Sequence, residues 1–203
     1  MFEAIIALFV FAFVGAGTPG PNNVMLMASG MNYGFRRSLS HIAGVAYGLP
    51  LMIIAIGLGL SSVFAALPWL EQALRIACAV YLVYLAYKIA TARPTVTADG
   101  LEVTGNPLTF WQAAAFQWVN PKAWVMVTTA LTVYALPLDG VWPALGAALV
   151  FACVGTVTAT SWTALGDRLR LFFEDSVRLR AFNICAAVVL LLTLVPVFWP
   201  GLL

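Results

Sequence analysis

The sequence predicts an all-α integral membrane protein with six transmembrane helices, arranged as two inverted three-helix halves. The 203 residues are 63% hydrophobic and 9% charged, whereas a soluble domain carries roughly 25% charged residues. Six segments are apolar over about the 20 residues that a helix needs to cross a bilayer. The first and fourth of them are interrupted by prolines. The mean hydropathy of the chain is +0.97, and this value excludes a soluble enzyme.

Polar or proline-containing stretches separate the apolar segments. The segments span residues 2–31, 39–67, 70–90, 108–136, 141–165 and 181–199. Residues 94–107 contain prolines, glycines and acidic residues, so we expect a loop there. This loop divides one transmembrane domain, 1–203, into halves 1–93 and 108–203. The first segment has no basic residues before it, so we interpret it as a retained helix and not as a cleavable signal peptide.

The positions of basic residues predict the orientation in the membrane. Loops one, three and five and their flanks carry Arg36, Arg37, Lys88, Arg93, Arg168, Arg170, Arg178 and Arg180. Basic residues are enriched on the cytoplasmic side of membrane proteins. We therefore expect these loops in the cytoplasm and both termini outside. Because three crossings reverse the chain, two halves that share a fold must be inverted relative to each other.

Two segments contain breaks that a regular helix does not tolerate. The first segment has Thr-Pro-Gly-Pro-Asn-Asn at residues 18–23, and the fourth has Gln-Trp-Val-Asn-Pro-Lys at residues 117–122. Proline removes a backbone donor and clashes with the preceding turn. Freed backbone groups are tolerated at membrane depth only beside protein or a watery cavity. Such breaks at matching positions of two halves are typical of a transporter's substrate site.

The breaks also contain the candidate binding residues. A helix that restarts after a break presents unpaired N–H groups and a positive dipole end, which suit a carboxylate. The carbonyl groups freed before the break suit an ammonium group, so one site can hold both ends of a zwitterion. The predicted substrate-binding residues are Pro19, Gly20, Pro21, Asn22, Asn23, Asn120, Pro121 and Lys122.

Two charged residues allow alternative interpretations. Lys122 lies inside an apolar segment, where an ionisable side chain is a functional hypothesis by default; alternatively it extends to the membrane interface. Asp167 is the best acidic candidate for ion coupling, and the alternative is a salt bridge in a loop. Small residues at four-residue spacing, Gly44 with Gly48 and Gly155 with Ala159 and Thr163, predict close helix packing. A homodimer through such a face is a hypothesis.

The two breaks resemble the signatures of the LysE/RhtB family of amino-acid exporters. The resemblance rests on residues 18–22, followed by Gly34 and the Gly44–Gly48 pair, and on residues 120–122. It covers essentially the whole chain, including the six segments and their division into halves.

The resemblance implies amino-acid efflux across the bacterial inner membrane, driven by proton antiport. It assigns a pocket role to residues 19–22 and 120–122. Many members have an acidic residue after Pro-Gly-Pro, where this chain has Asn22. We therefore expect neutral substrates, such as homoserine, threonine or branched-chain amino acids. The expected partners are the substrate, protons and membrane lipids, without nucleic acid; no catalytic residue, cofactor or metal ligand set is predicted.

Other functions need residues that the breaks do not offer. A membrane oxidoreductase needs paired cysteines, but Cys78, Cys153 and Cys185 fall in separate segments. A metal-ion exporter needs carboxylates, thiols or histidines in the breaks, and the chain has one histidine, His41. Export of another small solute or ion, or a non-transporting scaffold, stays open as an alternative.

Overall fold

The computed structural model describes residues 1–60, 66–92, 94–97, 100–103, 105–170 and 176–195. The helices are α1 (Phe2–Gly17), α2 (Pro21–Tyr33), α3 (Leu39–Ala55), α5 (Pro68–Ala90), α6 (Phe110–Val119), α7 (Pro121–Thr132), α8 (Trp142–Arg170) and α9 (Ser176–Leu192). A π-helical stretch, η1 (Ile56–Leu60), continues α3. Two short strands, β1 (Pro94–Thr97) and β2 (Gly100–Val103), precede α6.

Several of these helices meet the requirements of a membrane span. Leu39–Leu60, Gln72–Ala90 and Trp142–Arg170 are each long and apolar enough to cross a bilayer, and α1 with α2 makes a fourth span if the bent pair is counted as one. A helical membrane protein is therefore confirmed. The count of six stays a prediction, because α6 and α7 have only 10 and 12 residues. The predicted sixth segment also extends into residues 196–203, which lie outside the described part.

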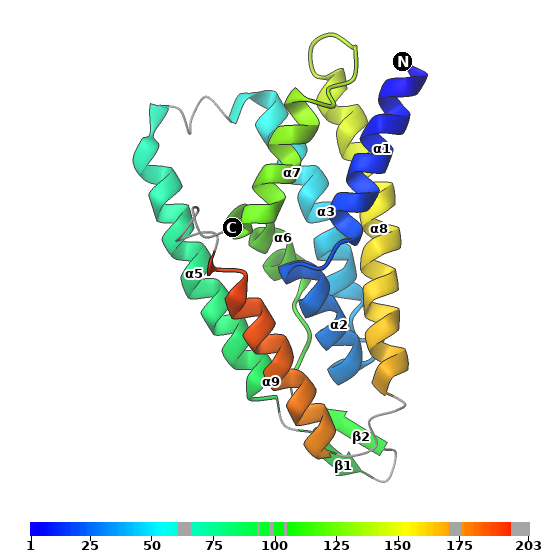
Figure 1. Cartoon of the computed structure of the whole chain (residues 1–203), viewed down its shortest axis with the longest axis vertical. Coiled ribbons are helices and arrows are strands. Elements are labelled where there is room, and N and C mark those ends of the chain that lie inside the picture. The colour runs from blue at the N-terminus through cyan, green and yellow to red at the C-terminus, as the bar shows by residue number, and fades with distance from the viewer. Residues whose placement is uncertain (61–65, 93, 98–99, 104, 171–175, 196–203) are drawn as a thin grey trace.

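The chain runs alternately down and up the long axis of the molecule (Figure 1). The pair α1–α2 descends from the N-terminus, whereas the pair α6–α7 ascends. Residues 34–38, the strands and the start of α9 lie at the lower end, and residues 133–141 lie at the upper end with the N-terminus. The segments that carry most basic residues are thus grouped at one end. The predicted position of the C-terminus falls outside the described residues.

Both predicted breaks are present, and proline starts the new helix in each. The backbone is extended at Thr18 (φ −67°, ψ 145°) and at Gly20 (φ −171°, ψ 178°), and Pro21 opens α2. The helices α1 and α2 bend by 56° here. At the second break Asn120 is extended (φ −92°, ψ 111°), and Pro121 opens α7. Proline suits the first position of a helix, where its missing N–H is not needed.

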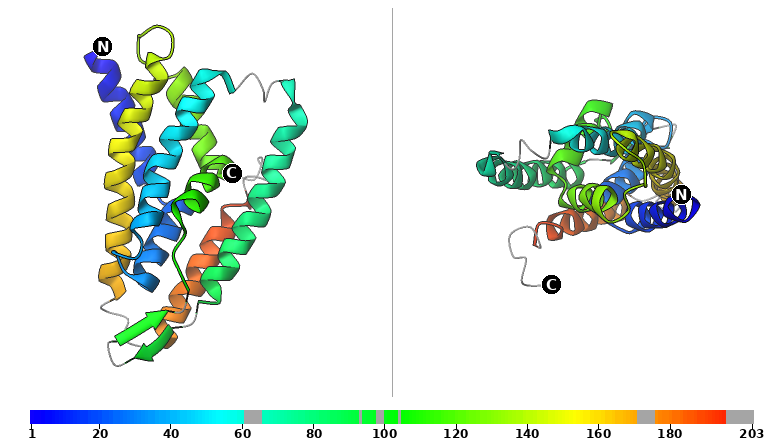
Figure 2. Two further views of the ribbon diagram at one scale, coloured as in Figure 1. Left: turned by 180° about the vertical axis from the view of Figure 1, so that it is seen from behind. Right: turned by 90° about the horizontal axis from the view of Figure 1, so that it is seen from above.

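Two apolar clusters flank these breaks. One joins α1, α3, α7 and α8 through buried residues that include Leu8, Met52, Val127 and Phe151. The other joins α2, α5, α6 and α9 through residues that include Met25, Leu82, Phe116 and Leu190. Figure 2 shows the corresponding flanks, with α5 beside α9 on one side and α1 beside α8 on the other. Each cluster mixes helices from both halves of the sequence.

Small residues bring the helices to backbone contact. A Cβ added to Gly30 of α2 would collide with the Thr163 carbonyl oxygen of α8, and one added to Gly166 would collide with the Met27 carbonyl oxygen of α2. A Cβ added to Gly48 of α3 would lie 2.7 Å from Ala114 Cα of α6. The predicted packing role is confirmed for Gly44 and Gly48, where an added Cβ would collide with α6, whereas Gly30 and Gly166 were not among the predicted residues.

The sequence predicted a loop at residues 94–107, but this segment contains two short strands in an otherwise helical protein. Strands β1 and β2 pair antiparallel, with Pro94 opposite Val103 and Thr97 opposite Gly100. Their β-branched residues favour extended backbone. The helix bounds also differ from the prediction: α8 continues beyond 165 to Arg170, and α9 begins before 181 at Ser176.

Candidate functional site

A cavity of about 40 Å³ lies between the two breaks, with room for a few water molecules. Both breaks are near the middle of the long axis (Figure 1). Six of the eight predicted binding residues line the cavity: Gly20, Pro21, Asn22, Asn23, Asn120 and Lys122. Pro19 is exposed and Pro121 is half-buried, and neither lines the cavity. The two prolines act on the backbone: Pro121 starts α7, and Pro19 lies in the extended segment before α2.

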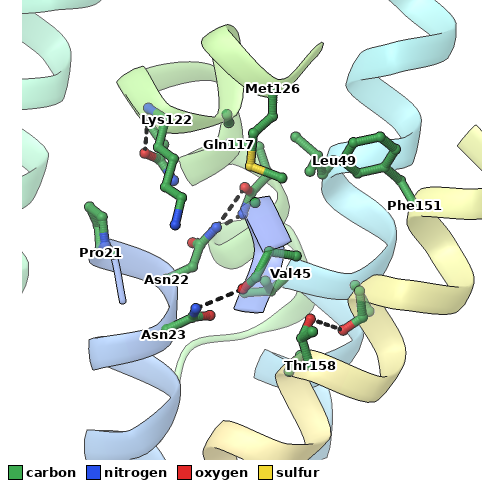
Figure 3. Close-up of a pocket in the computed structure, with 18 residues that line it drawn as sticks. Pro21, Asn22, Asn23, Val45, Leu49, Gln117, Lys122, Met126, Phe151 and Thr158 are labelled. Atoms are coloured by element: carbon green, nitrogen blue, oxygen red, sulfur yellow. Dashed lines mark hydrogen bonds between the residues drawn. The ribbon is translucent and has the colours of Figure 1, made fainter. Parts of the chain in front are cut away.

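The Lys122 side chain connects the second break to the first. Its Nζ donates to the Thr18 carbonyl oxygen (2.8 Å) and to Thr18 Oγ1 (2.9 Å). The same side chain passes over Gly20, where an added Cβ would lie 3.1 Å from Lys122 Cδ. Figure 3 shows it extended beside Asn22. Lys122 therefore turns inward between the breaks and does not extend to an interface.

A reciprocal pair of amides forms the second link between the breaks. Asn22 Nδ2 donates to Gln117 Oε1 (2.9 Å), and Gln117 Nε2 donates back to Asn22 Oδ1 (3.3 Å). Gln117 is completely buried and also donates to the Ala113 carbonyl oxygen (2.9 Å). A buried amide that lost its partner would be left unsatisfied, at a cost of about 1–3 kcal/mol. The pair therefore fixes α2 against α6 (Figure 3).

Side chains satisfy several carbonyl groups that the breaks release. Asn23 Nδ2 donates to the carbonyl oxygens of Ala16 (2.7 Å) and Thr18 (2.8 Å). Trp162 Nε1 of α8 donates to the Gly17 carbonyl oxygen (3.2 Å). In the second break, Trp124 Nε1 donates to the Trp118 carbonyl oxygen (2.8 Å). These bonds satisfy irregular backbone that lipid could not satisfy inside a membrane protein.

The two restarted helices differ at their N-termini. Asn120 Oδ1 accepts from the Lys122 backbone N–H (3.2 Å), so a side chain caps α7. No side chain caps α2, whose N-cap residue is Gly20. Its first-turn N–H groups and positive dipole end lie at the cavity, beside the Lys122 ammonium group. This arrangement suits an anion.

The remaining cavity wall is apolar apart from one hydroxyl group. Val45, Leu49, Met126 and Phe151 contribute apolar surface (Figure 3). Thr158 Oγ1 donates to carbonyl groups of its own helix, at 3.0 Å from Val154 O, so its lone pairs remain able to accept. None of the described residues that line the cavity is acidic. Among the residues of known placement, no three His, Cys, Asp or Glu side chains are grouped as a metal site.

Sequence reasoning missed three residues of the site, Thr18, Gln117 and Thr158. A detectable signal existed for the first two, because both are polar residues at the edges of the breaks. Thr158 carried no such signal, since it lies on a helix that is distant in sequence. Asp167, the acidic coupling candidate, lies outside the cavity: its Oδ1 accepts from the Phe35 backbone N–H (3.1 Å). It therefore holds the turn between α2 and α3.

Comparisons with known proteins agree with this geometry. The family model described as LysE type translocator matches residues 13–195. The chain is 33% identical over 196 residues to proteins named cysteine/O-acetylserine efflux protein from Escherichia coli (strain K12), Escherichia coli O139:H28 (strain E24377A / ETEC) and Shigella flexneri serotype 5b (strain 8401). Each match covers 95% of this chain and 96% of the relative. No solved structure gives a significant match.

Proposed function

Because the chain belongs to the LysE type translocator family, we propose that it exports neutral amino acids or close derivatives across the bacterial inner membrane by proton antiport. A translocator moves its substrate without changing it, so the chain is a transporter and not an enzyme. The site residues are proposed to bind the substrate directly. We propose that residues 34–38 and the strand segment face the cytoplasm.

One observation carries this proposal: the uncapped N-terminus of α2 and the Lys122 ammonium group face the same cavity. Together they provide hydrogen-bond donors and positive charge for a substrate carboxylate. The oxygens of Asn22, Gln117 and Thr158 can accept from the substrate's ammonium group. The apolar wall that includes Leu49 and Phe151 then receives the side chain.

The charge of the cavity favours neutral substrates. A basic side chain would find no carboxylate among the described residues that line it, and burying an unpaired charge is costly. The relatives are named for export of cysteine and O-acetylserine, which are neutral and small. We therefore place these two amino acids beside homoserine, threonine and branched-chain amino acids as candidates.

An export assay tests the proposal. Cells that lack their main amino-acid exporters would be loaded with dipeptides or with O-acetyl-L-serine, and amino acids in the medium would be measured over time. We compare the natural protein with Lys122→Ala and with Thr132→Ala, which changes an exposed hydroxyl on the same helix. Membrane abundance is checked by immunoblotting.

We expect faster release of one or a few neutral amino acids. Lys122→Ala should reduce the release about 10- to 100-fold, the equivalent of one hydrogen bond to a charged group, whereas Thr132→Ala should not. Release of basic amino acids alone would contradict the substrate class. If no amino acid is released faster at equal abundance, export of another solute is tested next, and then the scaffold alternative.

A further inference from the structure

A second cavity, of about 50 Å³, lies further along α2, toward the end where the basic loops are grouped. It is bounded by α2, α3, α5 and residues 106–108. Met25 and Asn32 of α2 line it, while Pro21 and Asn22 of the same helix line the central cavity. The two cavities therefore follow each other along one helix.

His41 of α3 is the unusual residue of this second cavity. Its side chain is 2% exposed, and neither Nδ1 nor Nε2 has a hydrogen-bond partner. These are the only buried side-chain nitrogen or oxygen atoms in the described part of the chain that lack one. A neutral imidazole carries one donor and one acceptor, so leaving both unpaired is costly. Two buried ring nitrogens without partners call for an explanation, either a function or a ligand.

The other buried polar residues near the cavity are occupied with each other. Ser29 Oγ lies 2.9 Å from Ser38 Oγ. Asn32 and Asn183 of α9 exchange hydrogen bonds of 2.7 and 2.9 Å, and Asn32 also donates to the Ala28 carbonyl oxygen. The free hydrogen-bonding capacity among these buried groups is therefore concentrated at His41.

The charged and titratable groups near His41 come from several elements. Lys88 of α5 and Tyr33 of α2 line the cavity. Arg37 is directed to the Gly105 carbonyl oxygen and Asn106 Oδ1, and Asp167 of α8 is bonded to the backbone of Phe35. From α9, the neutral Asn183 reaches Asn32 of this cavity. No described residue that lines the cavity is a carboxylate, so a protonated His41 has no fixed counter-ion there.

We propose that His41 is the site that binds and releases the proton exchanged for the substrate. This inference rests on the proposed antiport and extends it to a named group. When water enters the cavity, a lone pair of the imidazole accepts a proton from hydronium, which leaves water, and forms imidazolium; release of that proton to a water molecule forms hydronium again and restores the neutral ring. Histidine is the side chain whose charge changes most readily near neutral pH.

Antiport requires that proton and substrate do not bind at the same time. The absence of a carboxylate from the cavity lining meets this requirement. An imidazolium group at His41, with the Lys88 ammonium group nearby, repels the ammonium group of an approaching amino acid. Proton and substrate therefore exclude each other from the approach along α2. Release of the proton to the cytoplasm opens this approach to the substrate.

A direct test uses the fact that His41 is the only histidine in the chain. Protein labelled with ¹⁵N at histidine Nε2 alone, and purified without a histidine tag, gives one imidazole signal by nuclear magnetic resonance in lipid. We expect this signal to titrate within about pH 5 to 9, and saturating L-cysteine, kept reduced, to move the midpoint to lower pH. A ring that stays neutral over this range, with and without the amino acid, would overturn the proposal.

A functional test separates proton coupling from substrate movement. Proteoliposomes that contain the natural protein, His41→Gln or the exposed control Thr91→Ala would be assayed for exchange of radiolabelled L-cysteine and O-acetyl-L-serine at equal pH, and for accumulation driven by a pH gradient. We expect His41→Gln to lose gradient-driven accumulation at least about tenfold more than exchange. Thr91→Ala should lose neither.

Each other outcome is informative. Equal losses of exchange and accumulation in a monodisperse His41→Gln protein would show a structural or substrate-contact role and overturn the proposal, as would normal accumulation. His41→Asn provides a second variant if the first does not fold. If the natural protein exchanges neither amino acid, the proposed function fails on these substrates, while the imidazole titration still decides whether His41 binds a proton.

Discussion

At the scale of single residues, Lys122 and Thr18 connect two breaks that are 104 residues apart in the chain. The ammonium group contacts both the Thr18 carbonyl oxygen and Thr18 Oγ1. A substrate carboxylate would compete with these neutral oxygens for the same ammonium group, and the charged acceptor makes the stronger bond. We infer that Thr18 holds Lys122 in place between transport events.

The Thr18 hydroxyl group can be tested without removing the carbonyl contact. Thr18→Val removes Oγ1 and keeps the size of the side chain, so Lys122 retains one acceptor and becomes less well positioned. We expect export to fall about 5- to 30-fold, from a loss of about 1–2 kcal/mol. Thr18→Ser should restore at least half of it. Equal export by Thr18→Val and the natural protein in the same release assay would contradict this role.

The Asn22–Gln117 pair predicts a strong thermodynamic coupling. Asn22→Leu leaves the buried Gln117 amide without its partner and should lower the free energy of unfolding by about 1–3 kcal/mol. Gln117→Leu leaves the half-buried Asn22 amide without its partner and should also be destabilising. The double variant removes both amides and should be more stable than the sum of the single losses implies, by at least about 1 kcal/mol. The free energy of unfolding is measured in mixed detergent micelles for the natural protein, the two single variants and the double variant. Strictly additive losses would show that the two amides act independently.

At the scale of elements, the sequence predicted the breaks well because proline and glycine act locally. Pro21 and Pro121 start new helices wherever the rest of the chain lies. The groups that satisfy the breaks could not be predicted in the same way. Trp162 reaches Gly17 across 145 residues, and only the packing of α8 against α1 brings it there.

Other elements show where local patterns are weak. The strands at 94–97 and 100–103 have four residues each, too few to show clear alternation among prolines and glycines. Gln117 ends up buried at the site because α6 is cut short at Asn120. The sequence shows His41 only as a single histidine, because its lack of hydrogen-bond partners depends on how α2, α5 and residues 106–108 pack around it.

The contact between α2 and α8 predicts a sharp difference between two glycine substitutions. Gly166→Ala places a methyl group against the Met27 carbonyl oxygen, whereas a Cβ at Gly17 meets nothing within 4 Å. We expect Gly166→Ala to destabilise the protein by about 1–3 kcal/mol through overpacking, and Gly17→Ala to be nearly neutral. Thermal unfolding of both purified variants in detergent checks this. Equal unfolding midpoints for the two variants would mean that α2 and α8 separate easily.

At the scale of the whole molecule, the grouping of the basic loops at one end predicts which face meets the cytoplasm. In a protein whose three cysteines are replaced, single cysteines at the exposed positions Asn106 and Asp139 report on opposite ends. We expect a membrane-impermeant maleimide to label Asp139→Cys in intact cells and Asn106→Cys only after the membrane is opened. The reverse pattern would invert the orientation.

The backbone contact between α2 and α8 has a mechanical consequence. Gly30 and Gly166 leave no layer of side chains between the two helices, so there is nothing flexible that could reorient to let one slide along the other. A shift by one residue would press a Cβ atom into a carbonyl group. The two helices must therefore translate and tilt as one body, with the hinge for the lower half of the first broken helix lying at residues 18–20.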